Sequence, residues 1–266
     1  MLDWFQVLVL AIVQGLTEFL PVSSSAHLIL VPRLLGWQDQ GLAFDVAVHM
    51  GTLFAVVTYF RRDINQMLVG ALKSLFGHKQ STHAKLFWFI GIATIPAGLT
   101  GLLGKEIVET TLRSPMVIGV STLFFGLLLL VMDKLAKHER FENNLNWKDV
   151  MTIGCGQALA LIPGTSRSGI TLTTGLALGL TRQTAARFSF LLSIPVILLA
   201  AGYQSLHLIK SDLPVDWKAL SGGLFFSALS GYFCIHYFLK CLDKIGVTPF
   251  VIYRFILGTF ILIYFF

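Results

Sequence analysis

The chain has 266 residues, of which 55% are hydrophobic and only 13% are charged. Since roughly a quarter of the residues of an average soluble domain are charged, this composition argues against a soluble fold and indicates an integral membrane protein. The formal net charge of +6 is spread over short polar segments between apolar runs. That distribution is typical of cytoplasmic loops, so we expect no nucleic-acid partner.

The first 36 residues form two apolar pieces, 2–19 and 24–36, separated by a proline and a run of serines. Each is shorter than the about 20 residues that a helix needs to cross a bilayer. Asp3, Glu18 and the lack of a basic start and of a small-residue cleavage site distinguish the segment from a signal peptide. Because backbone breaks at membrane depth only under cover of protein or a wet cavity, residues 2–36 are predicted to form a re-entrant helix hairpin.

The rest of the chain contains six longer apolar stretches and a second broken pair. The six predicted membrane spans cover residues 41–60, 87–104, 115–132, 183–203, 220–239 and 249–265. The broken pair, 149–162 with 166–180, predicts a second re-entrant hairpin over 149–180.

The two halves of the chain resemble each other. PVSSSAH begins at Pro21 and PGTSRSG begins at Pro163, and each half has the order hairpin, span, span, span. An odd number of spans places the second copy upside down. We therefore predict one all-α polytopic membrane domain with two inverted-topology repeats, at 1–132 and 149–266, joined by a cytoplasmic linker at 133–148.

The distribution of Lys and Arg predicts the orientation. Eleven of these residues lie in segments 61–86, 133–148 and 240–248, against five in segments 1–40, 105–114 and 204–219. By the positive-inside rule both termini face outward, the first hairpin enters from outside and the second enters from the cytoplasm. The tips of the two hairpins are then expected to meet near the bilayer midplane.

The first hairpin carries an ionisable group at this depth. Gln14 and Glu18 are four residues apart and share one face of a helix that leads to the serine run. Intramembrane charge usually lines a polar pathway or a site, although a packing Glu kept neutral by protonation is the alternative. The two oxygen-bearing side chains suit a divalent cation, Mg²⁺ or Ca²⁺, that bridges to phosphate.

The second hairpin tip has the features of an anion site. A glycine, several hydroxyls, the planar fork of Arg167 and the start of a helix all favour phosphate. Thr165 and Ser166 can also be explained as helix caps, which leaves Arg167 in an apolar hairpin unexplained. The predicted phosphate-binding residues are Ser23, Thr165, Ser166, Arg167, Ser168 and Thr171.

The two motifs, QGLTEFLPVSS from Gln14 to Ser24 with His27, and PGTSRSGIT from Pro163 to Thr171, resemble the signatures of the bacterial undecaprenyl-diphosphate phosphatase family. The similarity runs end to end. It implies hydrolysis of undecaprenyl diphosphate at the outer face of the bacterial inner membrane, recycling of the carrier lipid for cell-wall synthesis, and bacitracin resistance. The implied partners are the lipid substrate and the bilayer, and the resemblance allows a homodimer.

The resemblance also implies roles for single residues. It places the essential carboxylate at Glu18, a candidate nucleophile at Ser24, an accompanying histidine at His27 and the phosphate-binding arginine at Arg167. The first acidic position of the family motif is Gln14 here, which leaves one carboxylate for the cation. The sequence leaves open whether Ser24 attacks phosphorus or orients a water, and whether His27 or Glu18 is the base.

Two further functions and the polar residues inside the spans have their own interpretations. An anionic-lipid transporter or flippase would also suit inverted repeats, whereas a histidine-type lipid phosphatase lacks its His because Thr173 stands at that position. Asp45 and His49 are expected to pair with each other inside the bundle, with a direct catalytic role as the alternative. Arg254 is expected to snorkel or to form a structural ion pair, with substrate contact as the alternative.

Overall fold

The computed structural model describes residues 2–77, 81–104, 112, 114–209 and 216–265, and all regular elements in these ranges are helical. Six of the helices are long and apolar enough to cross a membrane, and each covers one predicted span. They are α3 (Gly41–Tyr59), α5 (Thr82–Leu103), α7 (Pro115–Leu135), α10 (Arg182–Ile209), α11 (Trp217–Ile245) and α12 (Thr248–Phe265). The prediction of an all-α, multi-pass membrane protein is confirmed.

The two broken pairs form short helices where the sequence predicts them. The first pair is α1 (Trp4–Phe19) and α2 (Ser24–Leu35); the second is α8 (Trp147–Ala158), continued by the 3₁₀ turn η2 (Leu159–Leu161), and α9 (Arg167–Ala177). A helix rises 1.5 Å per residue, so a 12-residue helix such as α8 is about 18 Å long. That is well below the about 30 Å of a hydrocarbon core.

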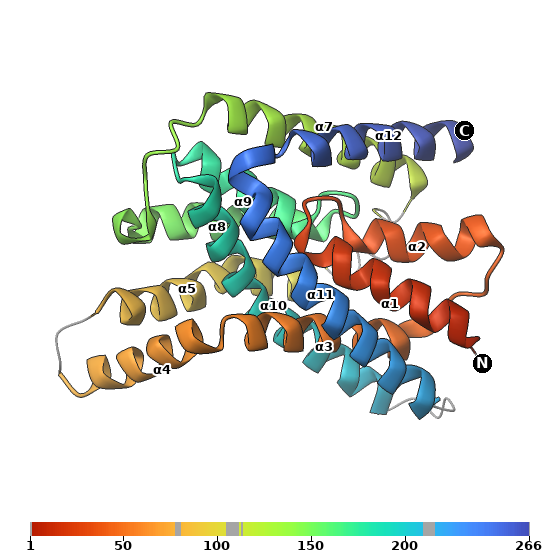
Figure 1. Cartoon of the computed structure of the whole chain (residues 1–266), viewed down its shortest axis with the longest axis horizontal. Helices are drawn as coiled ribbons and strands as arrows, with labels where there is room; N and C mark the ends of the chain where they lie inside the picture. Colours follow the sequence, from red (N-terminus) through yellow and green to blue (C-terminus); the bar gives the residue numbers. More distant parts are fainter. Residues whose placement is uncertain (1, 78–80, 105–111, 113, 210–215, 266) are drawn as a thin grey trace.

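One helix was not expected. Residues 61–86 read as a polar cytoplasmic segment, but α4 (Arg61–Leu75) forms there directly after α3. Met67 and Ala71, four residues apart, are buried where α4 lies along α5 (Figure 1). A 15-residue amphipathic helix is shorter and more polar than the about 20 apolar residues of a membrane span, so the pattern of apolar spans does not reveal it.

Close packing fixes the first hairpin against the second half of the chain. Helix α1 lies against α11 and α3. A Cβ atom at Gly15 of α1 would lie 2.7 Å from the Ser227 carbonyl oxygen of α11, so only glycine allows this approach. Small residues at helix interfaces permit such backbone contact in membrane proteins.

The linker between the two halves is anchored to the second hairpin. Arg140 donates to both carboxylate oxygens of Asp149, at 3.1 and 2.6 Å, and to the Leu178 carbonyl at 2.8 Å. These bonds join the linker to the start of α8 and the end of α9. The tips of the two hairpins are the loops before α2 and before α9. Figure 1 shows these two loops side by side in the middle of the molecule. A hydrogen bond joins them, because the Ser168 hydroxyl donates to the Leu20 carbonyl at 2.8 Å.

Candidate active site

Two short helices begin at the point where the loops meet. Ser23 precedes α2 with φ of 73°, and Ser166 precedes α9 with φ of 70°. Left-handed backbone costs a non-glycine residue roughly 1–2 kcal/mol, so both serines are held by their surroundings. The next residues, Ser24 and Arg167, therefore occupy the same first position of their helices, where free amide groups attract anions.

Arg167 and Glu18 form an ion pair across the two loops. Nη2 of Arg167 lies 3.1 Å from Oε1 of Glu18, and the exposed fractions of their side chains are 12% and 7%. Nη1 of Arg167 donates to the Ser189 carbonyl of α10 at 2.9 Å. The buried Nε of Arg167 has no partner within the described ranges, so one donor remains for a ligand.

The other carboxylate oxygen of Glu18, Oε2, lies close to three side chains. The Ser24 hydroxyl donates to Oε2 at 2.8 Å and the Gln14 amide donates to the same atom at 3.1 Å. Nε2 of His49 lies 3.8 Å from it. The Glu18 carboxylate is thus surrounded by Gln14, Ser24 and Arg167. These residues come from two separate sequence motifs.

His27 lies on the same helix as Ser24 but faces another partner. Its Nδ1 is 2.7 Å from the Ser23 carbonyl oxygen, and its Nε2 is 2.5 Å from the hydroxyl of Tyr253 on α12. A carbonyl only accepts, so Nδ1 carries the proton and Nε2 accepts from the tyrosine. The Ser24 hydroxyl therefore donates its hydrogen bond to Glu18 and not to His27.

The hydroxyls of the second motif differ in what they contact. Ser166 caps α9 by accepting from the Gly169 amide at 3.2 Å, and Ser168 joins the two loops. Thr171 donates to the Arg167 carbonyl at 2.8 Å and lies 2.6 Å from the Ser189 hydroxyl. The buried Thr165 hydroxyl has no partner in the part of the chain that the structure describes. Ser23 is also buried, with its hydroxyl 3.3 Å from that of Ser25.

The expectation for Arg254 is wrong. Its side chain does not snorkel to a membrane surface: it is fully buried and donates to four backbone carbonyls. The acceptors are Thr122 of α7, Pro21 of the first loop, and Gly164 and Thr165 of the second loop. Backbone carbonyl oxygens therefore accept the hydrogen bonds of Arg254, in place of the carboxylate of the expected ion pair.

The expected pairing of Asp45 with His49 is seen as a contact between the His49 ring and the Asp45 backbone. His49 Nδ1 lies 2.7 Å from the Asp45 carbonyl oxygen, while the Asp45 carboxylate accepts from the Gln40 amide at 2.8 Å. His49 is thereby turned toward Glu18. Sequence reasoning also missed Ser189 and Tyr253, because a serine or tyrosine inside an apolar helix carries no signal of what it faces.

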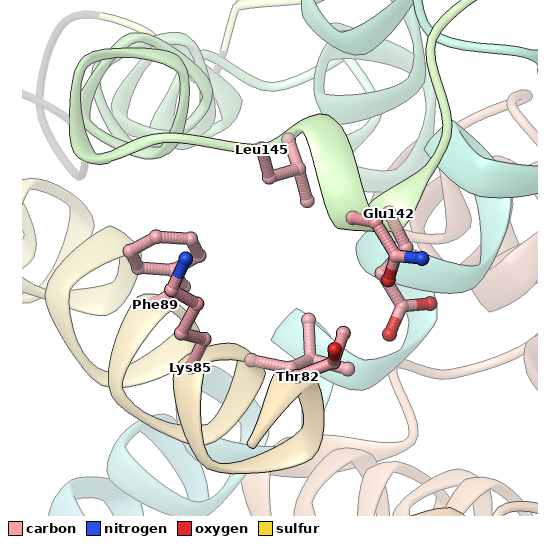
Figure 2. Close-up of a pocket in the computed structure, with 7 residues that line it drawn as sticks. Thr82, Lys85, Phe89, Glu142 and Leu145 are labelled. Carbon is pink, nitrogen blue, oxygen red and sulfur yellow. The ribbon is translucent and has the colours of Figure 1, made fainter. Parts of the chain in front are cut away.

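A pocket of about 40 Å³ lies outside this cluster (Figure 2). It is formed by the first turns of α5 and by the turn η1 (Glu142–Asn144) of the linker. Thr82, Lys85, Phe89, Glu142 and Leu145 surround it in Figure 2, and the lining includes none of Gln14, Glu18, Ser24 and Arg167. A cavity of this size holds about three waters and is too small for a diphosphate, so it is not the candidate site.

Comparison with known proteins gives relatives along the whole chain. The family described as "Bacitracin resistance protein BacA" matches residues 7–260. "Undecaprenyl-diphosphatase 2" of Stutzerimonas stutzeri (strain A1501) is 56% identical over 267 residues, which cover 99% of each chain. The undecaprenyl-diphosphatase of Thioalkalivibrio sulfidiphilus (strain HL-EbGR7) is 56% identical over 99% of this chain and 100% of the relative. That of Nitrosococcus oceani (strain ATCC 19707) is 55% identical over 97% of each chain.

Proposed function

Because the chain belongs to the bacitracin resistance protein BacA family, we propose that it is an undecaprenyl-diphosphatase, which releases phosphate from undecaprenyl diphosphate and leaves undecaprenyl phosphate. The observation that carries this proposal is the buried cluster of Glu18, Ser24 and Arg167 between two helix starts. The relatives of the chain are named undecaprenyl-diphosphatases, so the alternative function, a transporter or flippase, is not favoured.

The cluster suits a diphosphate. Arg167 is oriented by the Ser189 carbonyl, and its fork can exchange the Glu18 carboxylate for two phosphate oxygens. The free amides at the starts of α2 and α9, the unpartnered Arg167 Nε and the Thr165 hydroxyl add donors. In a low-dielectric site such fixed donors stabilise the charge that develops on the phosphoryl oxygens.

Ser24 and Glu18 are arranged for proton transfer. As the Ser24 oxygen bonds to the terminal phosphorus, its proton passes to the Glu18 carboxylate, whose Oε2 lies 2.8 Å from the Ser24 hydroxyl. The bond from that phosphorus to the bridging oxygen breaks, and undecaprenyl phosphate leaves. Water then cleaves the phosphoserine and releases phosphate. In the alternative route Ser24 only orients a water that gives its proton to Glu18.

A divalent cation, Mg²⁺ or Ca²⁺, belongs to this proposal. Glu18 supplies a carboxylate, and Gln14 is fully buried with an amide oxygen that has no partner among the described residues. An orphaned buried oxygen beside a carboxylate fits a hard cation, with water and phosphate oxygens completing the shell. When bound, the cation would offset the charge of the diphosphate.

We also propose the repeat architecture and the orientation. Two inverted repeats, each with a re-entrant hairpin, are supported by the shared cap geometry of Ser23 and Ser166 and by the short lengths of α1, α2, α8 and α9. The excess of Lys and Arg in 61–86, 133–148 and 240–248 supports a site that opens to the periplasmic face of the inner membrane. The proposal also includes a homodimer.

The test is phosphate release from undecaprenyl diphosphate by purified, detergent-solubilised protein. We expect turnover with Mg²⁺ or Ca²⁺, none in excess chelator, and none from Glu18→Gln at any cation concentration. Ser221→Ala, which removes an exposed hydroxyl bonded to the Lys218 carbonyl, is the matched control and should retain full activity. Full turnover in excess chelator would rule out the cation, and no turnover under any condition would rule out the proposed enzyme.

A further inference from the structure

His49 on α3 stands beside the catalytic carboxylate without an assigned role. Its Nδ1 lies 2.7 Å from the Asp45 carbonyl oxygen, which can only accept a hydrogen bond. The proton of the neutral ring is therefore on Nδ1, and the lone pair is on Nε2. A histidine whose second nitrogen is fixed in this way by a carbonyl has the usual arrangement of a metal-ligating imidazole.

That lone pair faces another acceptor. Nε2 of His49 is 3.8 Å from Oε2 of Glu18, and the His49 side chain is 33% exposed whereas that of Glu18 is 7% exposed. With the imidazole in its neutral form, two electron-rich atoms at this distance repel each other, and a cation between them removes that repulsion. Metal bonds to nitrogen and oxygen of about 2.1 Å allow one ion to bridge atoms up to about 4.2 Å apart.

Gln14 provides an independent observation at the same point. Its side chain is fully buried, its Oε1 has no partner within the described ranges, and its Nε2 is 3.1 Å from the same Glu18 oxygen. Rotating the amide by half a turn places the oxygen where the nitrogen is now. Two oxygens and one imidazole nitrogen would then face one point.

We propose that His49 is the nitrogen ligand of the divalent cation, with Glu18 and Gln14 as its oxygen ligands. This rests on the cation of the proposed function and extends it with a consequence for metal choice. An imidazole adds affinity for Mn²⁺ and Co²⁺ that it does not add for Ca²⁺, whose ligands are oxygens. The histidine would therefore compensate for the carboxylate that Gln14 does not supply.

Pulsed EPR on Mn²⁺ bound to the purified, tag-free protein in detergent tests this directly. Spectra are recorded with and without methylenediphosphonate, a diphosphate analogue that cannot be hydrolysed. We expect nitrogen-14 modulation from a coordinated imidazole in the wild type and in the control His236→Gln, whose histidine is exposed on α11, but not in His49→Gln. Titration should show Mn²⁺ affinity reduced by roughly tenfold or more in His49→Gln, and Ca²⁺ affinity reduced by less than about threefold.

Absence of nitrogen-14 modulation in the wild type, with or without the analogue, would overturn the assignment even if His49→Gln failed to fold. Equal Mn²⁺ affinity of His49→Gln and the wild type would do the same. Phosphate release measured on the same preparations keeps the two proposals apart. If the wild type shows nitrogen-14 modulation but releases no phosphate, the proposed diphosphatase activity is contradicted and the assignment of His49 as a ligand is not. If it releases phosphate but shows no modulation, only the assignment of His49 is contradicted.

Discussion

At the scale of single residues, the chemistry of the site depends on one carboxylate with two differently occupied oxygens. Oε1 of Glu18 faces Arg167, and Oε2 accepts from Ser24. Glu18 is buried and Ser24 and Arg167 are partly buried, so each group is held mainly by the others. Removing one partner leaves an uncompensated charge or donor, which costs more than the same change at a surface.

Arg167→Lys tests whether the planar fork matters. A lysine keeps the charge but cannot present two parallel N–H groups to phosphate, so we expect kcat/KM to fall about thirty-fold or more. The assay is phosphate release at varied undecaprenyl diphosphate, with Arg33→Lys, an exposed arginine of α2, as control. If Arg167→Lys matched the wild type, Arg167 would act only as a point charge.

Ser24→Ala separates nucleophile from orienting group. Loss of a nucleophile should reduce kcat by roughly four or more orders of magnitude while substrate still binds. Loss of a hydrogen bond to a water should cost nearer ten- to a hundred-fold. Mass spectrometry of wild-type protein quenched during turnover should find phosphoserine at position 24 in the first case. No adduct, together with a few per cent residual activity in Ser24→Ala, would leave water as the nucleophile.

At the scale of helices, α12 positions both loops through two adjacent residues. Arg254 donates to carbonyls of the first and second loops, and Tyr253 contacts His27, which contacts the Ser23 carbonyl. A planar guanidinium can donate five hydrogen bonds in fixed directions, so one residue holds several carbonyls that have no helical partner. We expect α12 to be a strut for the site as well as a membrane span.

Replacing Arg254 with Met should lower stability and activity together. The change keeps much of the side-chain length but leaves buried carbonyls without donors, at a cost on the order of 3 kcal/mol. For a chain of this size that corresponds to a fall in Tm of roughly 6–12 °C in a thermal melt. Arg33→Met is the control and should change Tm by less than about 2 °C. An unchanged Tm in Arg254→Met would contradict the proposal that Arg254 holds the two loops in place.

At the scale of the whole molecule, the site exists only because two distant parts of the chain meet. Glu18 and Ser24 come from the first half, and Arg167 and Ser189 from the second. Helix α1 of the first half packs against α11 of the second, and α8 of the second half packs against α5 of the first. Each half therefore buries the hairpin of the other, and we expect neither half to form the site alone.

Cysteine labelling tests the proposed orientation. In a variant without Cys155, Cys234 and Cys241, single cysteines are placed at four exposed positions, Asp39 and Lys218 on one side and Lys73 and Lys244 on the other. The charge distribution predicts that an impermeant thiol reagent labels Asp39→Cys and Lys218→Cys in intact spheroplasts, and the other two only after permeabilisation. The opposite pattern would contradict the outward-facing site.

The sequence by itself determined the class of the protein, the six long helices, the two broken pairs and the residues that face each other at the loops. These follow from local composition: apolar length sets a span, and Pro with clustered hydroxyls sets a break. Tertiary structure alone decided the amphipathic helix α4, the burial of Arg254, the turn of His49 toward Glu18 and the engagement of His27 by Tyr253. The reason is that a polar side chain inside an apolar helix bonds to whatever donor or acceptor the neighbouring helices bring near, and no local pattern encodes that neighbour.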